Sequence, residues 1–257
     1  MGERRERILS VVHDVGFVTI DRLAQEFGCS AQTVRRDLIA MESAGLLKRF
    51  HGGAGLPGSV ARPTYSAKQV TNTDAKDLIG AAAARIVASG DTVFFDVGTT
   101  VEAAALGLCA VLGEGRVGDV RAVCAGLATA SLLAGASGLT VEVLPGEVRT
   151  PDGAITGANT VAALADLRLD HAFLGVSAFD ADGSAWDFDP AKIAVKRAAL
   201  DAAKDGWVLA DATKFARTAA RRVCLARHLR GVITDVAPPP GPAEAFALAD
   251  CAIVVGD

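Results

Sequence analysis

Two stretches of this sequence combine residue types that recognise phosphate oxygens or nucleic-acid bases. The first is the run AQTVRRDL near the N-terminus, which contains Gln32, Thr33, Arg35 and Arg36. An arginine can bind a guanine edge through two hydrogen bonds, a glutamine can bind adenine, and a threonine can contact a phosphate or a thymine methyl group. This stretch therefore predicts base contacts in DNA, provided that these side chains share one face of a helix.

The apolar residues of the same stretch meet that condition. Val34, Leu38 and Met41 recur at helical spacing, so the polar side chains point away from them. Ser30 is a suitable N-cap for this helix and Gly45 a suitable end. Two further helical patterns precede it, separated by gaps of turn length, as in a helix-turn-helix. On its own, a charged helix face would more often be a solvated surface.

A short β-hairpin is predicted directly after the third helix. Residues 46–53, LLKRFHGG, end in a basic, glycine-rich tip. Lys48, Arg49 and His51 would lie in this wing, where cations neutralise DNA phosphates. The coincidence of three helices and a basic wing favours a DNA-binding domain over a solvated charged face.

The second stretch is Asp96-Val97-Gly98-Thr99-Thr100, which follows an apolar run and opens a helical pattern. Glycine permits close approach of the backbone to a ligand, and threonine hydroxyls with helix N-terminal N–H groups suit a phosphate oxygen. Taken alone the motif is weak, because a structural strand-to-helix turn has the same appearance.

Similar polar positions follow other predicted strands. Gly146 follows one strand, and Asp211 and Lys214 follow another. Lys214 would neutralise a phosphate and Asp211 would hold its ammonium group or a sugar hydroxyl, the alternative being an exposed lysine at a helix start. Because the carboxyl ends of strands in an open α/β sheet form one crevice, these groups are expected to converge there.

The pattern beyond residue 73 predicts an α/β domain. A helix over about residues 74–89 precedes seven short apolar runs, which alternate with helical stretches, as in a mostly parallel sheet covered on both faces. These runs are Thr92–Val97, Val120–Cys124, Leu139–Leu144, His171–Ser177, Trp207–Ala210, Val232–Thr234 and Ala252–Val255. The expected organisation is a DNA-binding domain over 1–56, a linker over 57–73 and a sensor domain over 74–257.

Composition narrows the class of protein further. The chain has 257 residues, of which 51% are hydrophobic and 22% charged, which excludes an intrinsically disordered chain. Its five cysteines are an odd number and widely spaced, so neither a disulfide framework nor a zinc site is expected. We find no signal peptide, membrane span, P-loop or dinucleotide fingerprint; the sequence therefore predicts a cytoplasmic protein without membrane, metal or cofactor.

These motifs resemble the DeoR family of bacterial transcriptional regulators. The resemblance runs from RRERILSVVHDVG through TVRRDL and HGGA to DTVFFDVGTT, DGAITG, DHAFLGVSAFD, KRA, LADATKF and VITD. It implies a winged helix-turn-helix followed by a Rossmann-like sensor similar to ribose-5-phosphate isomerase. The implied protein is a non-enzymatic repressor of a carbohydrate or glycerol catabolic operon. It would act as a homodimer or homotetramer on double-stranded operator DNA.

The resemblance also assigns the sensor residues. The implied effector is a phosphorylated sugar or polyol, with glycerol 3-phosphate as the first candidate. Its predicted binding residues are Asp96, Gly98, Thr99, Thr100, Gly146 and Lys214. The sequence departs from the family pattern at Cys124-Ala125 and at Pro145, and has Lys68 where the family has an arginine. The first two departures remove polar groups at positions expected to face the ligand.

Two alternatives remain open from the sequence. One is a sugar-phosphate isomerase with an appended helical domain, for which Asp96 or Asp211 would be the base. The other is a repressor whose sensor has lost its ligand, which Cys124, Ala125 and Pro145 would explain.

Overall fold

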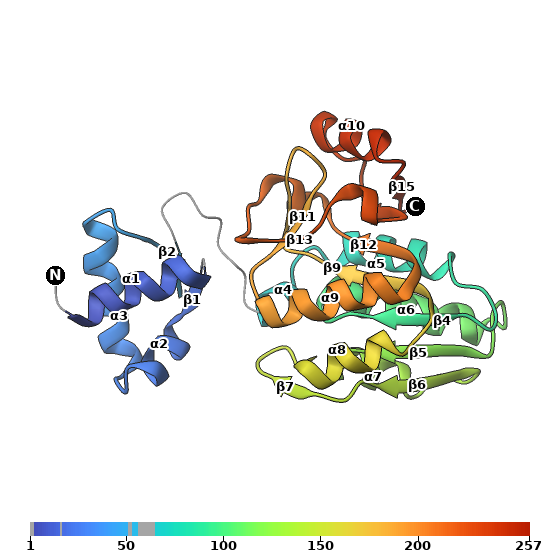
Figure 1. Cartoon of the computed structure of the whole chain (residues 1–257), viewed down its shortest axis with the longest axis horizontal. Helices are drawn as coiled ribbons and strands as arrows, with labels where there is room; N and C mark the ends of the chain where they lie inside the picture. The colour runs from blue at the N-terminus through green and yellow to red at the C-terminus, as the bar shows by residue number, and fades with distance from the viewer. Residues whose placement is uncertain (1–2, 16, 51–52, 56–64) are drawn as a thin grey trace.

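The computed structural model describes residues 3–15, 17–50, 53–55 and 65–257. The N-terminal domain contains the three predicted helices and the predicted hairpin (Figure 1). Its helices are α1 Glu3–Val15, α2 Ile20–Glu26 and α3 Ala31–Ser43, and its strands are β1 Phe17–Thr19, β2 Lys48–Phe50 and β3 Gly53–Gly55. The strands form an antiparallel sheet in the order β1-β3-β2. β1 was not predicted, because three residues are too short for an alternating pattern.

The ends of α3 are fixed by the predicted residues. The Thr33 N–H donates to the Ser30 hydroxyl oxygen at 3.1 Å, so Ser30 caps the helix. Gly45 has a φ of 69°, which a glycine adopts without strain, and its N–H donates to the Glu42 carbonyl. One face of α3 is buried with the apolar faces of α1 and α2, through Val34, Leu38 and Met41.

The sensor domain is built on a seven-stranded parallel sheet. The seven predicted runs all lie in it, as β4 Thr92–Phe95, β5 Val120–Cys124, β6 Leu139–Val143, β9 Leu169–Gly175, β12 Ala203–Leu209, β14 Gly231–Thr234 and β15 Ala252–Val255. The order across the sheet is β15-β14-β12-β9-β4-β5-β6, and neighbouring strands run parallel. The order reverses between β4 and β9, which is the point where open α/β sheets bind ligands. The predicted fold class is confirmed.

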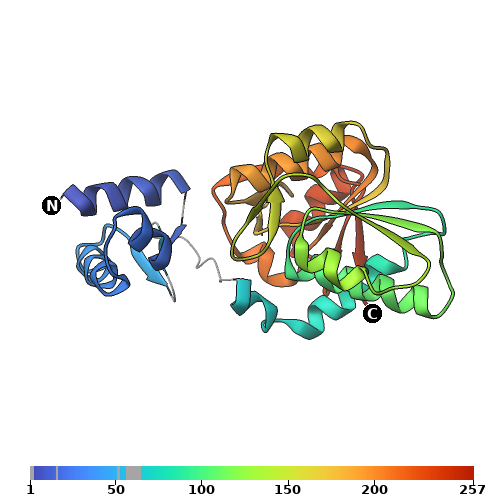
Figure 2. The ribbon, with the colours of Figure 1, turned by 90° about the horizontal axis from the view of Figure 1, so that it is seen from below.

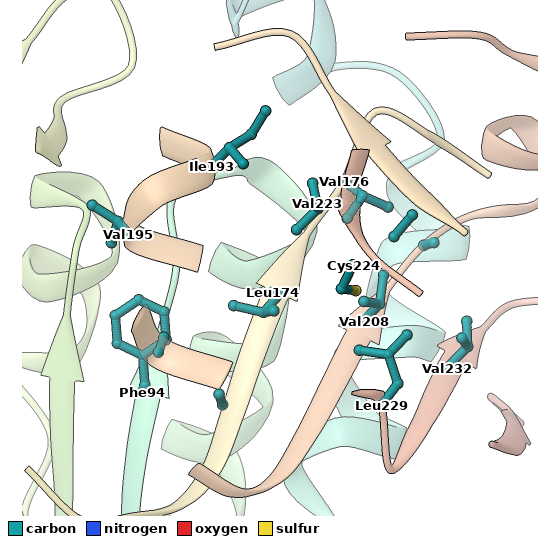
Figure 3. Close-up of a cluster of buried hydrophobic side chains, with 14 of the residues drawn as sticks. Phe94, Leu174, Val176, Ile193, Val195, Val208, Val223, Cys224, Leu229 and Val232 are labelled. Atoms are coloured by element: carbon teal, nitrogen blue, oxygen red, sulfur yellow. The ribbon is translucent and has the colours of Figure 1, made fainter. Parts of the chain in front are cut away.

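Helices cover both faces of this sheet (Figure 2). On one face lie α5 Thr73–Ala84, α6 Thr99–Gly113 and α7 Leu127–Leu133; on the other lie α8 Ala158–Ala165 and α9 Pro190–Ala202. Adjacent residues of β4 therefore serve two cores. Phe95 packs with the α5–α7 face, whereas Phe94 joins Leu174, Val208 and α9 on the other (Figure 3).

Glycines bring α5 and α6 into close contact. A Cβ atom on Gly80 would lie 2.4 Å from the Ala103 carbonyl oxygen, and one on Gly107 would lie 2.5 Å from the Gly80 carbonyl oxygen. No side chain fits at either position without moving backbone. The close packing fixes α6, whose N-terminus opens at the carboxyl end of β4.

Several short elements were not predicted. They are the hairpin of β7 Glu147–Arg149 and β8 Ala154–Thr156, the small sheet of β10 Ala178–Phe179, β11 Ala185–Asp187 and β13 Arg221–Cys224, and the helices η1 Ala212–Ala216, η2 Ala226–His228 and α10 Pro240–Leu248. The predicted linker over 57–73 also contains a helix, α4 Tyr65–Gln69, and α5 already begins at Thr73. In the described residues, no helix is both long and apolar enough to cross a bilayer.

Candidate DNA-binding face and effector crevice

The outer face of α3 presents cations to solvent. Arg35, Arg36 and Gln32 are exposed, and none of the three forms a hydrogen bond or ion pair within the described part of the chain. Thr33 is half-buried, and its hydroxyl lies 2.9 Å from the Ser30 hydroxyl, so it takes part in the cap. The helix thus leaves two guanidinium groups and one amide available for a ligand outside the domain.

A buried carboxylate on the inner face of α3 was missed by the sequence analysis. Asp37 accepts hydrogen bonds from Arg4 Nε at 2.7 Å and from Arg5 Nε at 2.8 Å. Burial alone would raise the pKa of Asp37, but the two guanidinium groups outweigh it and hold the pKa below its ordinary value. Arg4 and Arg5 therefore tie α1 to α3. The feature of the sequence that could have indicated this contact is an acidic residue on the apolar stripe of a helix.

The predicted wing cations differ in their surroundings. Lys48 and Arg49 are both exposed. Glu42, at the end of α3, accepts hydrogen bonds from Arg49 Nε at 2.7 Å and from the Arg49 backbone N–H at 2.8 Å. Arg49 must therefore leave or share this carboxylate to contact a phosphate. His51 lies outside the described residues.

In the sensor domain, Asp96 lies where the strand order reverses. It directly follows β4 and is 1% exposed. Its Oδ2 atom accepts hydrogen bonds from the Gly175 N–H at 3.1 Å, at the end of β9, and from the Lys196 ammonium group. Asp96 was predicted to bind the effector directly. The structure shows that this carboxylate already has protein partners and joins β4 to β9, and its effector contact stays a prediction.

Lys196 completes a buried triad that the sequence analysis did not assign. Its ammonium group contacts Asp96 Oδ2, donates to the Gly175 carbonyl at 2.8 Å and lies 3.5 Å from Asp187 Oδ2. Burial would lower the pKa of Lys196, but the two carboxylates outweigh it and hold the pKa above its ordinary value. Its spacing from Ile193 and Ala199 places this lysine on the buried face of α9. That spacing is the feature of the sequence that could have indicated a buried lysine.

Lys214 and Asp211 form a second pair after β12. Lys214 is 8% exposed, which excludes the interpretation as an exposed helix-start lysine. Its Nζ atom lies 3.7 Å from Asp211 Oδ2, as the predicted role of Asp211 required. Burial lowers the pKa of Lys214, and the Asp211 carboxylate only partly opposes this effect. A buried ammonium group with one distant anionic partner is suited to accept a second anion.

The N-terminus of α6 is open at the same edge of the sheet. Gly98 is its N-cap, with a φ of 139° and no side-chain cap, and a Cβ atom there would have no neighbour within 4 Å. The first N–H groups of a helix lack intrahelical partners, so those after Gly98 are available to an anion. Thr99 and Thr100 begin this helix, with Thr100 buried and Thr99 half-buried.

Gly146 has a packing role in the structure. A Cβ atom there would lie 2.1 Å from Thr160 Oγ1 and 2.7 Å from the Thr156 carbonyl oxygen. Thr160 donates a hydrogen bond of 2.7 Å to the Pro145 carbonyl, which fixes this turn against α8. Within the described residues, no hydrogen bond joins Gly146 to Lys214 or Asp96, so its predicted effector contact stays a prediction.

The departure at Cys124, the last residue of β5, and at Ala125 also lies inside the protein. Cys124 and Ala125 are buried, one in each hydrophobic core. The Ala125 carbonyl accepts a hydrogen bond of 2.8 Å from the Ile155 N–H on β8. Their side chains therefore face the cores, and the expectation that these positions face the ligand is wrong. Within the described residues, no group of three or more metal-ligating side chains is found.

Two family models match the chain. The DeoR-like helix-turn-helix domain matches residues 4–60, and the DeoR C-terminal sensor domain matches residues 71–236. The chain belongs to the DeoR family. The two matched ranges agree with the two folded units of the structure.

Characterised members of the DeoR family align along most of this chain. It is 33% identical to the glycerol-3-phosphate regulon repressor of Escherichia coli K12, over 93% of this chain and 92% of that protein. The repressor of the same name from Haemophilus influenzae is 34% identical over 86% of this chain and 84% of that protein. The lactose phosphotransferase system repressor of Lactococcus lactis is 32% identical over 95% and 94% of the two chains.

Solved structures give a more distant likeness. Ribose 5-phosphate isomerase A from Methanocaldococcus jannaschii aligns with a TM-score of 0.42 at 16% identity, covering 56% of this chain and 55% of that one. A likeness at this level carries no conclusion about activity.

Proposed function

We propose that this chain is a ligand-released repressor of a carbohydrate or glycerol catabolic operon. In this proposal the outer face of α3 reads the operator in the major groove, and Lys48 and Arg49 contact DNA phosphates. The observation that carries the proposal is the pair of exposed guanidinium groups on Arg35 and Arg36, which lack a protein partner within the described residues. A structural role would pair them, as Arg4 and Arg5 are paired with Asp37.

The effector we propose is a phosphorylated sugar or polyol. Its phosphate would lie between Lys214 and the N-terminus of α6, because both groups face the carboxyl edge of the sheet, α6 has no side-chain cap, and Lys214 Nζ lies as far as 3.7 Å from its partner Asp211 Oδ2. Thr99 and Thr100 would add hydroxyl donors. Glycerol 3-phosphate is the first effector to test, since two relatives are named for its regulon.

Release from DNA requires that the effector bind one subunit arrangement better than another. A ligand with equal affinity for both would shift nothing, and allosteric couplings are typically about 1–3 kcal/mol. We expect a homodimer or homotetramer, whose recognition helices would be spaced about 34 Å apart, or a multiple of that distance, to match successive turns of DNA.

The isomerase alternative finds little support in the positions of its two candidate bases, of which Asp211 is already paired with Lys214 and accepts hydrogen bonds from Thr213. Asp96 Oδ2 already accepts hydrogen bonds from Lys196 and from the Gly175 N–H, and the carboxylate is almost fully buried. Proton abstraction by Asp96 would require both contacts to break. We therefore propose that the sensor binds its ligand without turning it over.

The test is fluorescence anisotropy on DNA from upstream of the chain's own operon, at two salt concentrations, with and without a panel of sugar and polyol phosphates. Phosphate contacts make DNA affinity fall steeply with salt. We expect tight, sequence-dependent binding that glycerol 3-phosphate weakens. Lys214→Met should keep DNA binding and lose this response, whereas Arg35→Ala should show the reverse. Tight binding that no phosphate weakens would support a sensor that has lost its ligand.

A further inference from the structure

The segment that precedes α5 is attached to the crevice by side chains from both sides. This connector, residues 65–72, comprises α4 and the turn that follows it, and it comes directly after the part of the chain that leads from the DNA-binding domain. Among the contacts of its described residues are those with Glu102 of α6, with Asp211 and with Lys76 of α5. Glu102 and Asp211 lie on elements that border the candidate effector site.

At its start, the connector contacts α6. The Tyr65 hydroxyl donates a hydrogen bond of 2.7 Å to Glu102 Oε1. Glu102 lies in the first turn of the helix that begins at Gly98, and its N–H donates to the Gly98 carbonyl at 2.9 Å. Burial and the Glu102 carboxylate raise the pKa of Tyr65 above its ordinary value, so the phenol stays a donor at neutral pH.

At its end, the connector contacts the carboxylate that pairs with Lys214. Asn72 Nδ2 donates a hydrogen bond of 3.3 Å to Asp211 Oδ1. Asn72 precedes α5 and has a left-handed backbone, with a φ of 53°, but its side chain makes no cap to that helix. Asparagine is among the best N-caps, so its turn toward Asp211 forgoes a favourable local contact.

Between these ends, Lys76 of α5 holds the connector backbone. Its ammonium group contacts the carbonyl oxygens of Lys68 and Thr71. A cation at the last carbonyls of α4 is favoured by the helix dipole. Because Lys76 is buried, this contact closes the connector onto the sensor domain.

From this arrangement we infer that the connector reports occupancy of the crevice to the DNA-binding domain, through Tyr65 on Glu102 and Asn72 on Asp211. A phosphate that engages Lys214 and the N-terminus of α6 changes the charges beside both acceptors. It draws Lys214 away from Asp211, and its negative charge repels the carboxylates of Glu102 and Asp211, which moves both acceptors away from Tyr65 and Asn72. The docked connector belongs to the DNA-binding state, and effector binding undocks it. The inference rests on the proposed function, because it needs an effector in the same crevice.

The test compares the full-length protein with the double variant Tyr65→Phe/Asn72→Ala. Both changes are small and lie at the periphery of the fold. Arg85→Ala is the control, because it removes an exposed ion pair with Asp257 at the end of α5. For each protein, operator affinity is measured with and without glycerol 3-phosphate, binding of glycerol 3-phosphate is measured by calorimetry, and hydrogen exchange is followed in residues 65–76.

In the wild type and the control, glycerol 3-phosphate should weaken operator binding by about 5-fold or more and speed amide exchange in the connector. The double variant should bind the operator at least about 3-fold more weakly without effector. It should still bind glycerol 3-phosphate within about 3-fold of wild type, but lose less than about 2-fold further operator affinity when it does. A double variant released to the same extent as wild type would overturn the inference.

The two proposals fail in different ways. If glycerol 3-phosphate and the rest of the panel leave the wild type on its operator, the proposed effector class is wrong. The role of the connector is then tested by operator binding and hydrogen exchange of the protein without ligand. A double variant with weaker operator binding and faster connector exchange, at an unchanged melting temperature, supports the coupling. A double variant with wild-type operator affinity would exclude the coupling between the connector and the DNA-binding domain.

Discussion

In the DNA-binding domain, Arg35 and Arg36 project into solvent without protein partners among the described residues, whereas in the sensor domain Lys196 and Lys214 are almost completely buried. The exposed arginines cost the fold little, because water solvates them. The buried lysines are stable only beside carboxylates, because an unpaired charge in the interior is expensive. This difference is the one expected if the exposed arginines of the first domain bind a large external partner and Lys214 of the second domain binds a small one.

This difference predicts where substitutions act. Removing an exposed arginine should change binding and leave folding intact. Removing a buried lysine that is held by two carboxylates, as Lys196 is, should change folding. The experiments below test that division, beginning with the largest expected effect.

Lys196→Met should reduce the free energy of unfolding by about 3–5 kcal/mol, because it leaves Asp96 and Asp187 buried without their cation. Urea denaturation followed by circular dichroism measures this loss. The matched control is Arg121→Ala, which breaks an exposed pair with Glu142 and should cost at most about 1 kcal/mol. Equal losses in the two variants would contradict the structural role of the triad.

Arg35→Ala and Arg36→Ala should each weaken operator binding by about 1–3 kcal/mol if the arginine reads a guanine. Their free energies of unfolding should stay within about 0.5 kcal/mol of wild type, because neither side chain has a partner in the described part of the domain. Fluorescence anisotropy on operator DNA and on scrambled DNA distinguishes a contact to a base from a contact to a phosphate. A base contact is lost only on the operator, and a phosphate contact is lost on both. Unchanged operator binding by both variants would remove the assignment.

Asp37→Asn should lower the free energy of unfolding by about 1 kcal/mol at pH 7, since its partners Arg4 and Arg5 are half-exposed. The pKa of Asp37 is lower in the folded state than in the unfolded chain, so the carboxylate stabilises the fold above the ordinary pKa. That contribution is lost as the pH falls through the folded pKa. The difference between wild type and variant should therefore shrink below about pH 4. A difference independent of pH would exclude an ionic cause.

Arg49→Ala should weaken operator binding by less than about 1 kcal/mol. The guanidinium group is already paired with Glu42, so a phosphate contact has to replace an existing one. The slope of the logarithm of the binding constant against the logarithm of the salt concentration should fall in magnitude by about 1, because one phosphate contact is lost. A loss as large as that of Arg35→Ala would show that the pair with Glu42 opens completely on DNA.

Local patterns were sufficient for much of the fold. The sequence predicts α3 with its cap at Ser30, and the seven strands of the parallel sheet, because helical spacing and short apolar runs are properties of neighbouring residues. The same patterns miss β1, the β7–β8 hairpin and the helix α4, whose five or fewer residues give no periodicity. β1, β8 and α4 make contacts with parts of the chain that are distant in sequence, whereas β7 pairs with the neighbouring strand β8.

The candidate sites divide in the same way. The outer face of α3 follows from the sequence alone, since about 3.6 residues per turn decides which side chains stand opposite Val34, Leu38 and Met41. The ion pair and the hydrogen bond at the crevice required the tertiary structure, because Asp96 pairs with Lys196 across 100 residues and Asn72 donates to Asp211 across 139. Strand order, which depends on how the whole sheet assembles, decides which of these groups are neighbours. It therefore decides which carboxylates and ammonium groups compensate one another inside the protein.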